Sequence, residues 1–235
     1  MGSLLLDDYR DQVATLLRTS ALEDALDAIE EGALEACIDE AVSEYSRDRP
    51  RHVVDMTLDG DGSASEFRID DLNVPFEWEF SRFSAVEHPT GEDPRVVLDE
   101  NEYGVGHDDS GNLVLRFDAT PESGTNNIRL DYSARHSLST TASTIADADH
   151  FAICRLAAAI ALESLSIAAT HGREANVEAT EIAVAPKSTA YRVAAEAFRT
   201  EYRRRVKPVA GTHTRDWDQT LTWGRPRLNR PARWQ

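Results

Sequence analysis

The stretch Ile38 to Val54, IDEAVSEYSRDRPRHVV, contains the end of a helix and the start of a strand. Pro50 forbids continuation of the helix, and Val53 and Val54 begin an extended run. The apolar residues before the proline recur at helical spacing: Ile38, Ala41, Val42 and Tyr45. The junction predicts an α+β protein in which the chain passes directly from a helix into a β-rich segment.

Two helical patterns precede this stretch. Ser3 is expected to cap a first helix. A second helix is expected to begin at Ser20, where Glu23 completes a capping box, and to end at Gly32. The apolar face of the first comprises Leu5, Leu6, Tyr9, Val13, Leu16 and Leu17. The stripe of the second comprises Leu22, Leu26 and Ile29.

Two further helical patterns lie near the carboxyl end. Asp147 or Asp149 is expected to cap a helix that runs through Phe151 to about Thr170 and is ended by Gly172. Apolar residues nearly encircle this helix, so it is expected at the centre of a bundle. The last helix is expected over residues 188 to 205, with three arginines in its final turn.

Residues 51 to 138 carry short alternating runs separated by turn signals. The signals are Asp61-Gly62, Thr90-Gly91, Ser110-Gly111 and Ser123-Gly124. This pattern predicts an antiparallel sheet or small barrel. The expected organisation is a helical bundle of residues 1–50 and 139–204, interrupted by a β-rich insertion of residues 51–138 and followed by an extended basic C-terminal arm of residues 205–235.

Three segments resemble the head-tail connector (adaptor) proteins of tailed phages and prophages. They are the basic turn Tyr45 to Arg51 (YSRDRPR), the segment Phe76 to Pro89 (FEWEFSRFSAVEHP) and the segment Ile128 to Leu138 (IRLDYSARHSL). An alanine-rich helix then follows, and together the similar positions cover most of residues 38–204. Each segment also has an ordinary interpretation, with Trp78 as a buried aromatic and Arg47, Arg49 and Arg51 as a solvated helix end.

The resemblance implies a function based on assembly. Members of that family form a ring, typically a dodecamer, beneath the portal of the capsid. Each subunit has a helical bundle at its core and a C-terminal arm that docks on the portal clip. The β insertion of this chain is longer than that of the smallest members, and it is expected to face outward, contact capsid or fibres, or receive the next neck protein.

The chain is acidic, with 42 Asp and Glu residues against 25 Lys and Arg residues and a net charge of −17. Lys187 and Lys207 are its only lysines. A surface with so much carboxylate repels itself in dilute buffer and is better tolerated where concentrated salt screens charge. The composition therefore indicates a salt-loving host, and with the resemblance a haloarchaeal virus.

The end of the chain is basic. From Arg203 to Gln235 there are nine basic residues against Asp216 and Asp218, a net charge of +7, which leaves −24 on residues 1–202. The arm also holds three of the four tryptophans, and Asp216 to Trp223 (DWDQTLTW) alternates as an added β-strand requires. Arginine and tryptophan often dominate interface energies. The candidate portal-binding residues are Arg203, Arg204, Arg205, Trp217, Leu221, Trp223, Arg225, Arg227, Arg230 and Trp234.

The arm has two alternative interpretations. Basic residues interleaved with aromatics can neutralise phosphates and stack on bases, although the acidic body and high salt oppose nucleic-acid binding. A terminus of no functional consequence is the other alternative.

The sequence predicts no catalytic, cofactor or metal site. Its histidines are scattered, and neither a nucleophile elbow nor a phosphate-binding loop occurs. Asp59-Gly60-Asp61-Gly62 resembles the start of a calcium loop, but position 70 is aspartate where glutamate is required, so a hairpin turn is expected. The run His107-Asp108-Asp109 is expected to be a solvated loop.

Two further features concern the environment of the protein. No apolar segment of about 20 residues free of polar interruption is found, so no membrane contact is expected and the protein is expected to be soluble and assembled in the host cytoplasm. Cys37 and Cys154 fall on apolar helical stretches, which favours reduced core residues.

The sequence therefore predicts a structural subunit of the virion neck and not an enzyme. Its expected partners are the portal protein, neighbouring copies of itself in a ring, and tail or neck proteins, with DNA only as the transiting genome. The alternative is a tail-completion or fibre-attachment module that binds through residues 51–138, and an unrecognised enzyme is the third possibility.

Overall fold

A computed structural model describes residues 4–19, 29, 31–70, 72–175 and 181–206. Within these residues the protein is α+β, with helices and two small antiparallel sheets. The described residues divide into two compact units. The helical unit is formed by residues of 4–53, 70–81 and 133–206, and the β unit by residues of 54–69 and 82–132.

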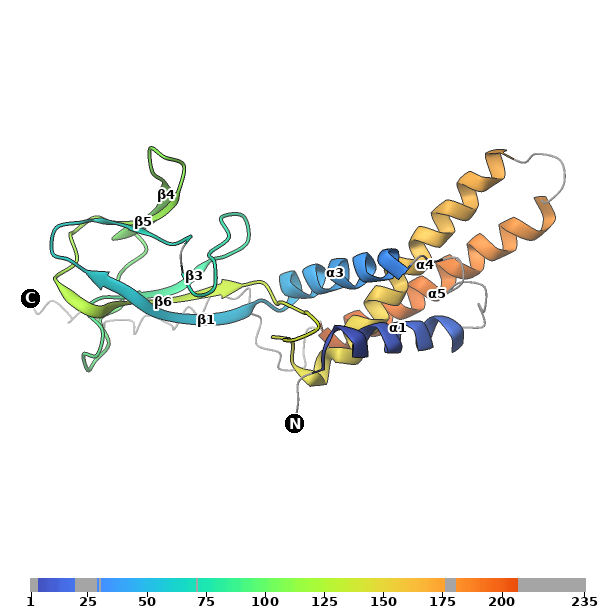
Figure 1. Ribbon diagram of the computed structural model, residues 1–235, viewed down its shortest axis with the longest axis horizontal. Helices are drawn as coiled ribbons and strands as arrows, with labels where there is room; N and C mark the ends of the chain where they lie inside the picture. The colour runs from blue at the N-terminus through green and yellow to red at the C-terminus, as the bar shows by residue number, and fades with distance from the viewer. Residues whose placement is uncertain (1–3, 20–28, 30, 71, 176–180, 207–235) are drawn as a thin grey trace, which may run out of the picture. The chain divides into compact units, whose positions relative to one another are not determined.

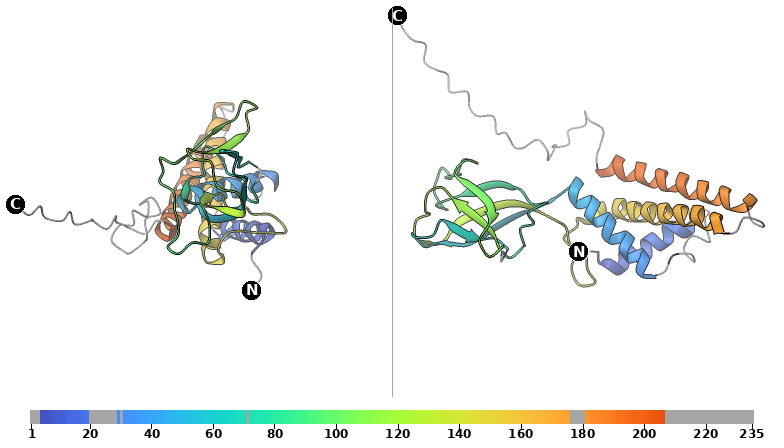
Figure 2. Two further views of the ribbon diagram at one scale, coloured as in Figure 1. Left: turned by 90° about the vertical axis from the view of Figure 1, so that its left-hand side faces the viewer. Right: turned by 90° about the horizontal axis from the view of Figure 1, so that it is seen from above.

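The helical unit contains four α-helices and one 3-10 turn among the residues described (Figure 1). They are α1 (Leu6–Thr19), α3 (Glu31–Asp48), η1 (Asp147–Asp149), α4 (His150–Ala175) and α5 (Glu181–Val206). Figure 2 shows α4 between α5 on one side and α1 and α3 on the other. The expectation that α4 is the central helix is therefore confirmed.

The core of the helical unit is closely packed around α4. Leu156 and Leu162 of this helix are completely buried, as are Val13 of α1 and Ile38 of α3. Alanines fill much of the remaining α4 surface, and small side chains allow neighbouring helices to approach. Both cysteines lie in this core as free thiols, and burial raises the pKa of the Cys154 thiol to about 12.

Arg199 fixes α5 to the rest of the bundle. Its Nε lies 2.5 Å from Glu163 Oε1 on α4, and its Nη1 lies 3.2 Å from Glu44 Oε2 on α3. The hydrogen bond to Glu163 raises the pKa of Arg199. Further along α5, the hydroxyl of Tyr202 donates to Asp48 at 2.9 Å. Polar contacts therefore join α5 to α3 and α4 in addition to the apolar core.

Several predicted helix boundaries differ from the observed ones. Helix α1 begins after Leu5, whose backbone N–H is bound by the Asp8 carboxylate at 2.8 Å. Gly32 is the second residue of α3, and the helix that it was expected to end lies outside the described residues. Helix α4 continues beyond Gly172 to Ala175. Helix α5 begins at Glu181, earlier than expected. The predicted caps Ser3 and Ser20 and the helix after Ser20 lie outside the residues that the structure describes.

The aspartates before α4 do not cap it as expected. Ala146 precedes the 3-10 turn, and no side chain there caps the helix with a hydrogen bond. The Asp149 carboxylate is bound by Tyr45 and Arg49 instead. The donors come from α3 and from the residue that follows it, and both bind Oδ2, while Oδ1 lies 3.9 Å from Arg205 Nε.

The β unit contains two three-stranded sheets, ordered β1-β6-β3 and β2-β5-β4. The strands are β1 (Arg51–Gly60), β2 (Glu66–Arg68), β3 (Phe83–Glu87), β4 (Tyr103–His107), β5 (Leu113–Phe117) and β6 (Gly124–Ala134). Residues at the ends of β1 and β6 belong to the helical unit. The direct passage from α3 into β1, predicted from Pro50, is confirmed.

Three of the four predicted turns contain a glycine in the left-handed region. Gly62, Gly91 and Gly111 have φ of 75°, 85° and 84°, which L-residues rarely adopt. Gly124 instead begins β6. Asp59 and Gly60 end β1, and Asp61 and Gly62 follow in a bend that is not a hairpin turn, because β1 and β2 belong to different sheets. The Asp61 carboxylate accepts from the N–H groups of Ser63 and Ala64 and so closes this turn locally.

The segment Phe76 to Pro89 is a strand only over β3. Trp78 lies in a turn and is 48% exposed, so the interpretation of it as a buried aromatic is wrong. Nearby, Arg135 holds this segment within the helical unit. Its Nε lies 2.5 Å from Glu77 Oε2, its Nη1 donates to Ser43 at 3.0 Å, and its guanidinium stacks on Phe80.

Two histidines of the helical unit, His136 and His150, are partly or fully buried. Burial lowers the pKa of both His136 and His150 below the ordinary value of 6.5. His136 Nε2 lies 2.9 Å from the Arg49 carbonyl and Nδ1 lies 3.0 Å from the Thr144 carbonyl. Both contacts favour the charged ring, but burial outweighs them and lowers the pKa of His136. A histidine whose pKa is lowered by folding stabilises the fold above its ordinary pKa and loses that contribution as the pH falls.

We therefore expect the helical unit to lose stability as the pH falls below about 6.5. Urea unfolding followed by the helical circular dichroism signal at pH 7.5 and pH 5.5 measures this change. The double variant His136→Gln and His150→Gln should show a weaker pH dependence over that interval. The variant His52→Gln, at an exposed position, should retain it. Identical pH profiles for all three proteins would contradict the explanation.

Candidate partner-binding site

The last turn of α5 carries Arg203, Arg204 and Arg205. Cations at the carboxyl end of a helix are stabilised by the exposed carbonyl groups of the last turn. Arg203 also pairs with Glu196 on the same helix, with Nη1 and Oε1 3.3 Å apart. Val206, the last residue of α5, is buried. The point at which the arm leaves the bundle is therefore part of the packed structure.

Asp149 anchors this end of α5 to the start of α4. One carboxylate oxygen accepts from the Tyr45 hydroxyl and from Arg49 Nη1, both at 2.8 Å. The other oxygen lies 3.9 Å from Arg205 Nε. Arg205 Nη2 also donates to the carbonyl of Ala148 at 3.2 Å. A single buried carboxylate thus connects α3, the start of α4 and the end of α5.

The environment of Tyr45, which donates to Asp149, keeps its hydroxyl protonated. Burial raises the pKa of Tyr45, and the hydrogen bond to Asp149 raises it further. The tyrosine therefore acts as a permanent hydrogen-bond donor. The guanidinium of Arg49 is a second donor to the same carboxylate oxygen, and it has no acceptor atoms.

An open hollow of about 450 Å³ lies beside this anchor. The described residues that line it are Ala148, Phe151, Ala152, Arg155 and Arg205. Phe151 is 57% exposed, which is unusual for a large aromatic side chain at the start of a core helix. Arg155 Nε lies 2.7 Å from Glu201 Oε2. The hollow combines an exposed ring, two small side chains and two guanidinium groups, a composition typical of protein interfaces.

The structure describes three of the ten predicted portal-binding residues, and it brings one of them, Arg205, into the hollow. Arg203 and Arg204 lie on the same turn. The other seven lie outside the described residues: Trp217, Leu221, Trp223, Arg225, Arg227, Arg230 and Trp234. Phe151 and Arg155 were not among the predicted residues, because the apolar pattern of α4 places Phe151 in the core. The position of Phe151 in the first turn of α4, before the run of alanines, was the available signal that its side chain could be exposed.

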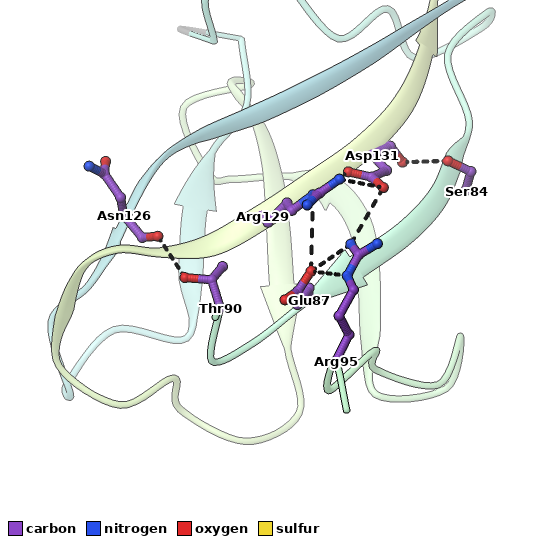
Figure 3. A network of polar contacts seen from close by, with 7 residues as sticks. All are labelled: Ser84, Glu87, Thr90, Arg95, Asn126, Arg129 and Asp131. Carbon is purple, nitrogen blue, oxygen red and sulfur yellow. Dashed lines mark hydrogen bonds and ion pairs between the residues drawn. The ribbon is translucent and has the colours of Figure 1, made fainter. Parts of the chain in front are cut away.

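A second polar cluster lies in the β unit (Figure 3). Glu87 of β3 and Asp131 of β6 are both buried. Arg95 Nε donates to Glu87 at 2.7 Å, and Arg129 Nε donates to Asp131 at 2.8 Å. Arg129 Nε also lies 4.0 Å from Glu87, so the arginines link the two carboxylates. Because both carboxylates are neutralised by ion pairs, the cluster is suited to stabilising the sheet.

The side chain of Asp108 forms hydrogen bonds with the backbone of its own loop. Asp108, after β4, accepts from the N–H groups of Ser110 and Asn112, both at 2.8 Å. These contacts and the Asn112 side chain lower the pKa of Asp108. Among the residues that the structure describes, no group of three or more His, Cys, Asp or Glu side chains has an arrangement that could hold a metal ion.

One helix in the described part of the chain, Asp147–Thr170, is long and apolar enough to cross a membrane. This corrects the expectation that no such segment exists. The same helix packs against α1, α3 and α5, and most of its apolar residues belong to the core of the helical unit. Packing within the bundle therefore accounts for its composition.

Comparison of the chain with protein-family models, with curated proteins and with solved structures gives no match.

Proposed function

We propose that this chain is a structural head-tail adaptor subunit of a tailed virus, which forms a ring between the portal and the tail. The observation that carries the proposal is the fixed origin of the arm. Arg205 and Val206, the first two residues of the predicted arm of residues 205–235, belong to α5. Arg205 donates to the Ala148 carbonyl at 3.2 Å and lies 3.9 Å from Asp149, and Val206 is buried. An arm rich in tryptophan and arginine, with a rigid starting point, is suited to docking on a partner surface.

The charge distribution supports the same proposal. The arm is basic and the rest of the chain strongly acidic. A ring lumen lined with carboxylates repels the phosphate backbone, so that DNA passes without binding. In this proposal the protein works by binding and geometry and not by catalysis. The acidic surface also agrees with a host that accumulates salt.

Capture from source lysate tests the proposal. We would immobilise the full-length chain, a version ending at Val206 and the full-length variant Trp78→Ala, and identify the retained proteins by mass spectrometry in molar salt. Ending at Val206 preserves all of α5, because Val206 is its last residue. Trp78→Ala is the matched control, since it removes an exposed tryptophan that is not in the arm.

Portal protein is expected on the full-length chain and on Trp78→Ala, and not on the version ending at Val206. Equal capture of tail or fibre proteins by all three would move the function to the β unit. Capture of no virion protein by any form would overturn the adaptor proposal.

A further inference from the structure

The outer face of α1 is acidic. Tyr9, Val13 and Leu17 of this helix are buried in the core, so the exposed residues on its other side point away from the core. There, three aspartates stand against a single arginine, and these residues with one threonine form the α1 face: Asp7, Asp8, Asp11, Thr15 and Arg18. Arg10 pairs with both Asp7 and Glu35 of α3, so it does not remove this acidic excess.

The outer face of α5 is basic. Tyr191, Ala195 and Tyr202 are buried, so the exposed residues opposite them also point away from the core. There, three arginines stand against a single glutamate, and the α5 face comprises Arg192, Glu196, Ala197, Thr200, Arg203 and Arg204. Arg203 pairs with Glu196 of the same helix. Arg192 and Arg204 form no ion pair within the residues that the structure describes, so two positive charges of this face are uncompensated.

The α1 face and the α5 face lie on opposite sides of the helical unit, because α4 lies between these two helices (Figure 2). Leu4 N, before α1, lies 3.4 Å from Asp147 Oδ1, next to the start of α4. At the same end, Arg205 Nη2 of α5 donates to the Ala148 carbonyl at 3.2 Å. Helix α1 therefore begins where α5 ends. A second copy placed alongside in the same orientation brings the start of its α1 next to the end of α5.

The charges of the two faces match in one antiparallel register. In this register opposite charges face each other about one helical turn on either side of a central pair of threonines. The facing residues are Asp11 with Arg204, Thr15 with Thr200, and Arg18 with Glu196. The small central side chains allow the helix axes to approach to about 8–10 Å. A two-fold arrangement would instead place aspartates against aspartates, or arginines against arginines, and like charges repel.

We propose that the α5 face of one copy binds the α1 face of a second copy of this chain. Each copy then uses one face toward one neighbour and the other face toward the next, an arrangement that closes into a ring where the rotation between copies allows it. The closed ring rests on the proposed function, but the contact itself needs no portal. A single contact between two short helices is smaller than a standard interface and therefore weak, and it is strengthened where several copies assemble.

Disulfide trapping between two full-length proteins tests the contact. One protein carries Thr15→Cys and the other Thr200→Cys, both at exposed positions. The native cysteines are buried, and the raised pKa of Cys154 makes it unreactive. Under mild oxidation the mixed disulfide should form at least about tenfold faster than a disulfide between two copies of either protein. Equal rates, or faster bonding of like with like, would overturn the proposal.

An exchange of charge between the two faces tests their specificity. We would measure it in the lowest salt that preserves the helical circular dichroism signal, because salt screens exposed charges. Adding Asp7→Lys and Asp11→Lys to the first protein should slow the mixed disulfide at least about fivefold. Adding Arg203→Glu and Arg204→Glu to the second protein should then restore the rate. A loss of rate without restoration would show that these residues do not face each other, and the proposal would fail.

The matched control changes the net charge by the same amount elsewhere. Glu92→Lys with Glu100→Lys, at exposed positions of the β unit, should leave the rate unchanged. An equal slowing by this control would show that only the overall charge matters, which would overturn the contact. Absence of the mixed disulfide together with capture of portal protein would overturn the contact alone. A mixed disulfide without capture of any virion protein would support the contact and overturn the proposed function.

Discussion

Replacing Arg129 by methionine is expected to lower the free energy of unfolding of the β unit by about 3–5 kcal/mol. Arg129 pairs with Asp131 and lies near Glu87, and these carboxylates expose only 11% and 4% of their side chains. Methionine keeps most of the side-chain volume but removes the charge. Arg95 alone then faces two buried carboxylates, one of which stays poorly compensated.

Native-state hydrogen exchange of the β3 and β6 amides measures this effect, because it reports the opening of the β unit separately from that of the helical unit. Arg116→Met is the matched control. Arg116 pairs with Glu66 at 2.8 Å, but both side chains are about half exposed. An exposed pair contributes at most about 1 kcal/mol. Equal, small losses in the two variants would show that the Glu87 and Asp131 cluster is not a buried ion-pair network.

Replacing Asp149 by alanine is expected to destabilise the helical unit by about 3 kcal/mol. The substitution removes the acceptor of Tyr45 and Arg49 and the ion pair with Arg205. The buried Tyr45 hydroxyl then lacks its partner, which is costly in a site with little access to water. The end of α5 should also exchange its amide hydrogens faster.

Urea unfolding and hydrogen exchange of the last turn of α5 measure the two consequences. Asp147→Ala is the matched control, because Asp147 is exposed and its carboxylate accepts only a 3.4 Å contact from Leu4 N–H in the described part of the chain. That variant should lose less than about 1 kcal/mol. If Asp149→Ala were no more destabilising than Asp147→Ala, the anchor would not be a structural element.

Local sequence signals predicted much of the fold. Pro50 marked the passage from helix to strand because its ring excludes helical geometry for the residue before it. Gly62, Gly91 and Gly111 marked turns that require positive φ. The apolar character of α4 predicted its central position in the bundle. Each of these inferences depends on residues that lie close together in the sequence.

The remaining features depend on contacts between distant residues. Glu87 and Asp131 gave no local sign that they would be buried together with Arg95 and Arg129. The strand orders and the inclusion of residues 70–81 in the helical unit were equally unpredictable from local patterns. Asp149 was expected to cap a helix, but its carboxylate accepts a hydrogen bond from Tyr45. Because Tyr45 lies 104 positions away in the sequence, no local pattern indicates this contact.

The candidate site was predicted only in part. The basic end of α5 and the aromatic residues of the arm were visible as composition. The hollow was not, because it forms where Phe151 and Arg155 of α4 meet Arg205 of α5. The helical pattern of apolar residues does not distinguish an exposed phenylalanine from a buried one. Only the position of the neighbouring helix determines which of the two Phe151 is.

The most direct test of the adaptor proposal is to mix the purified chain with purified portal rings in molar salt and measure the mass of the particles. The proposal predicts that portal particles gain a defined number of copies of the full-length chain and none of the version ending at Val206. Portal particles of unchanged mass with the full-length chain would contradict it.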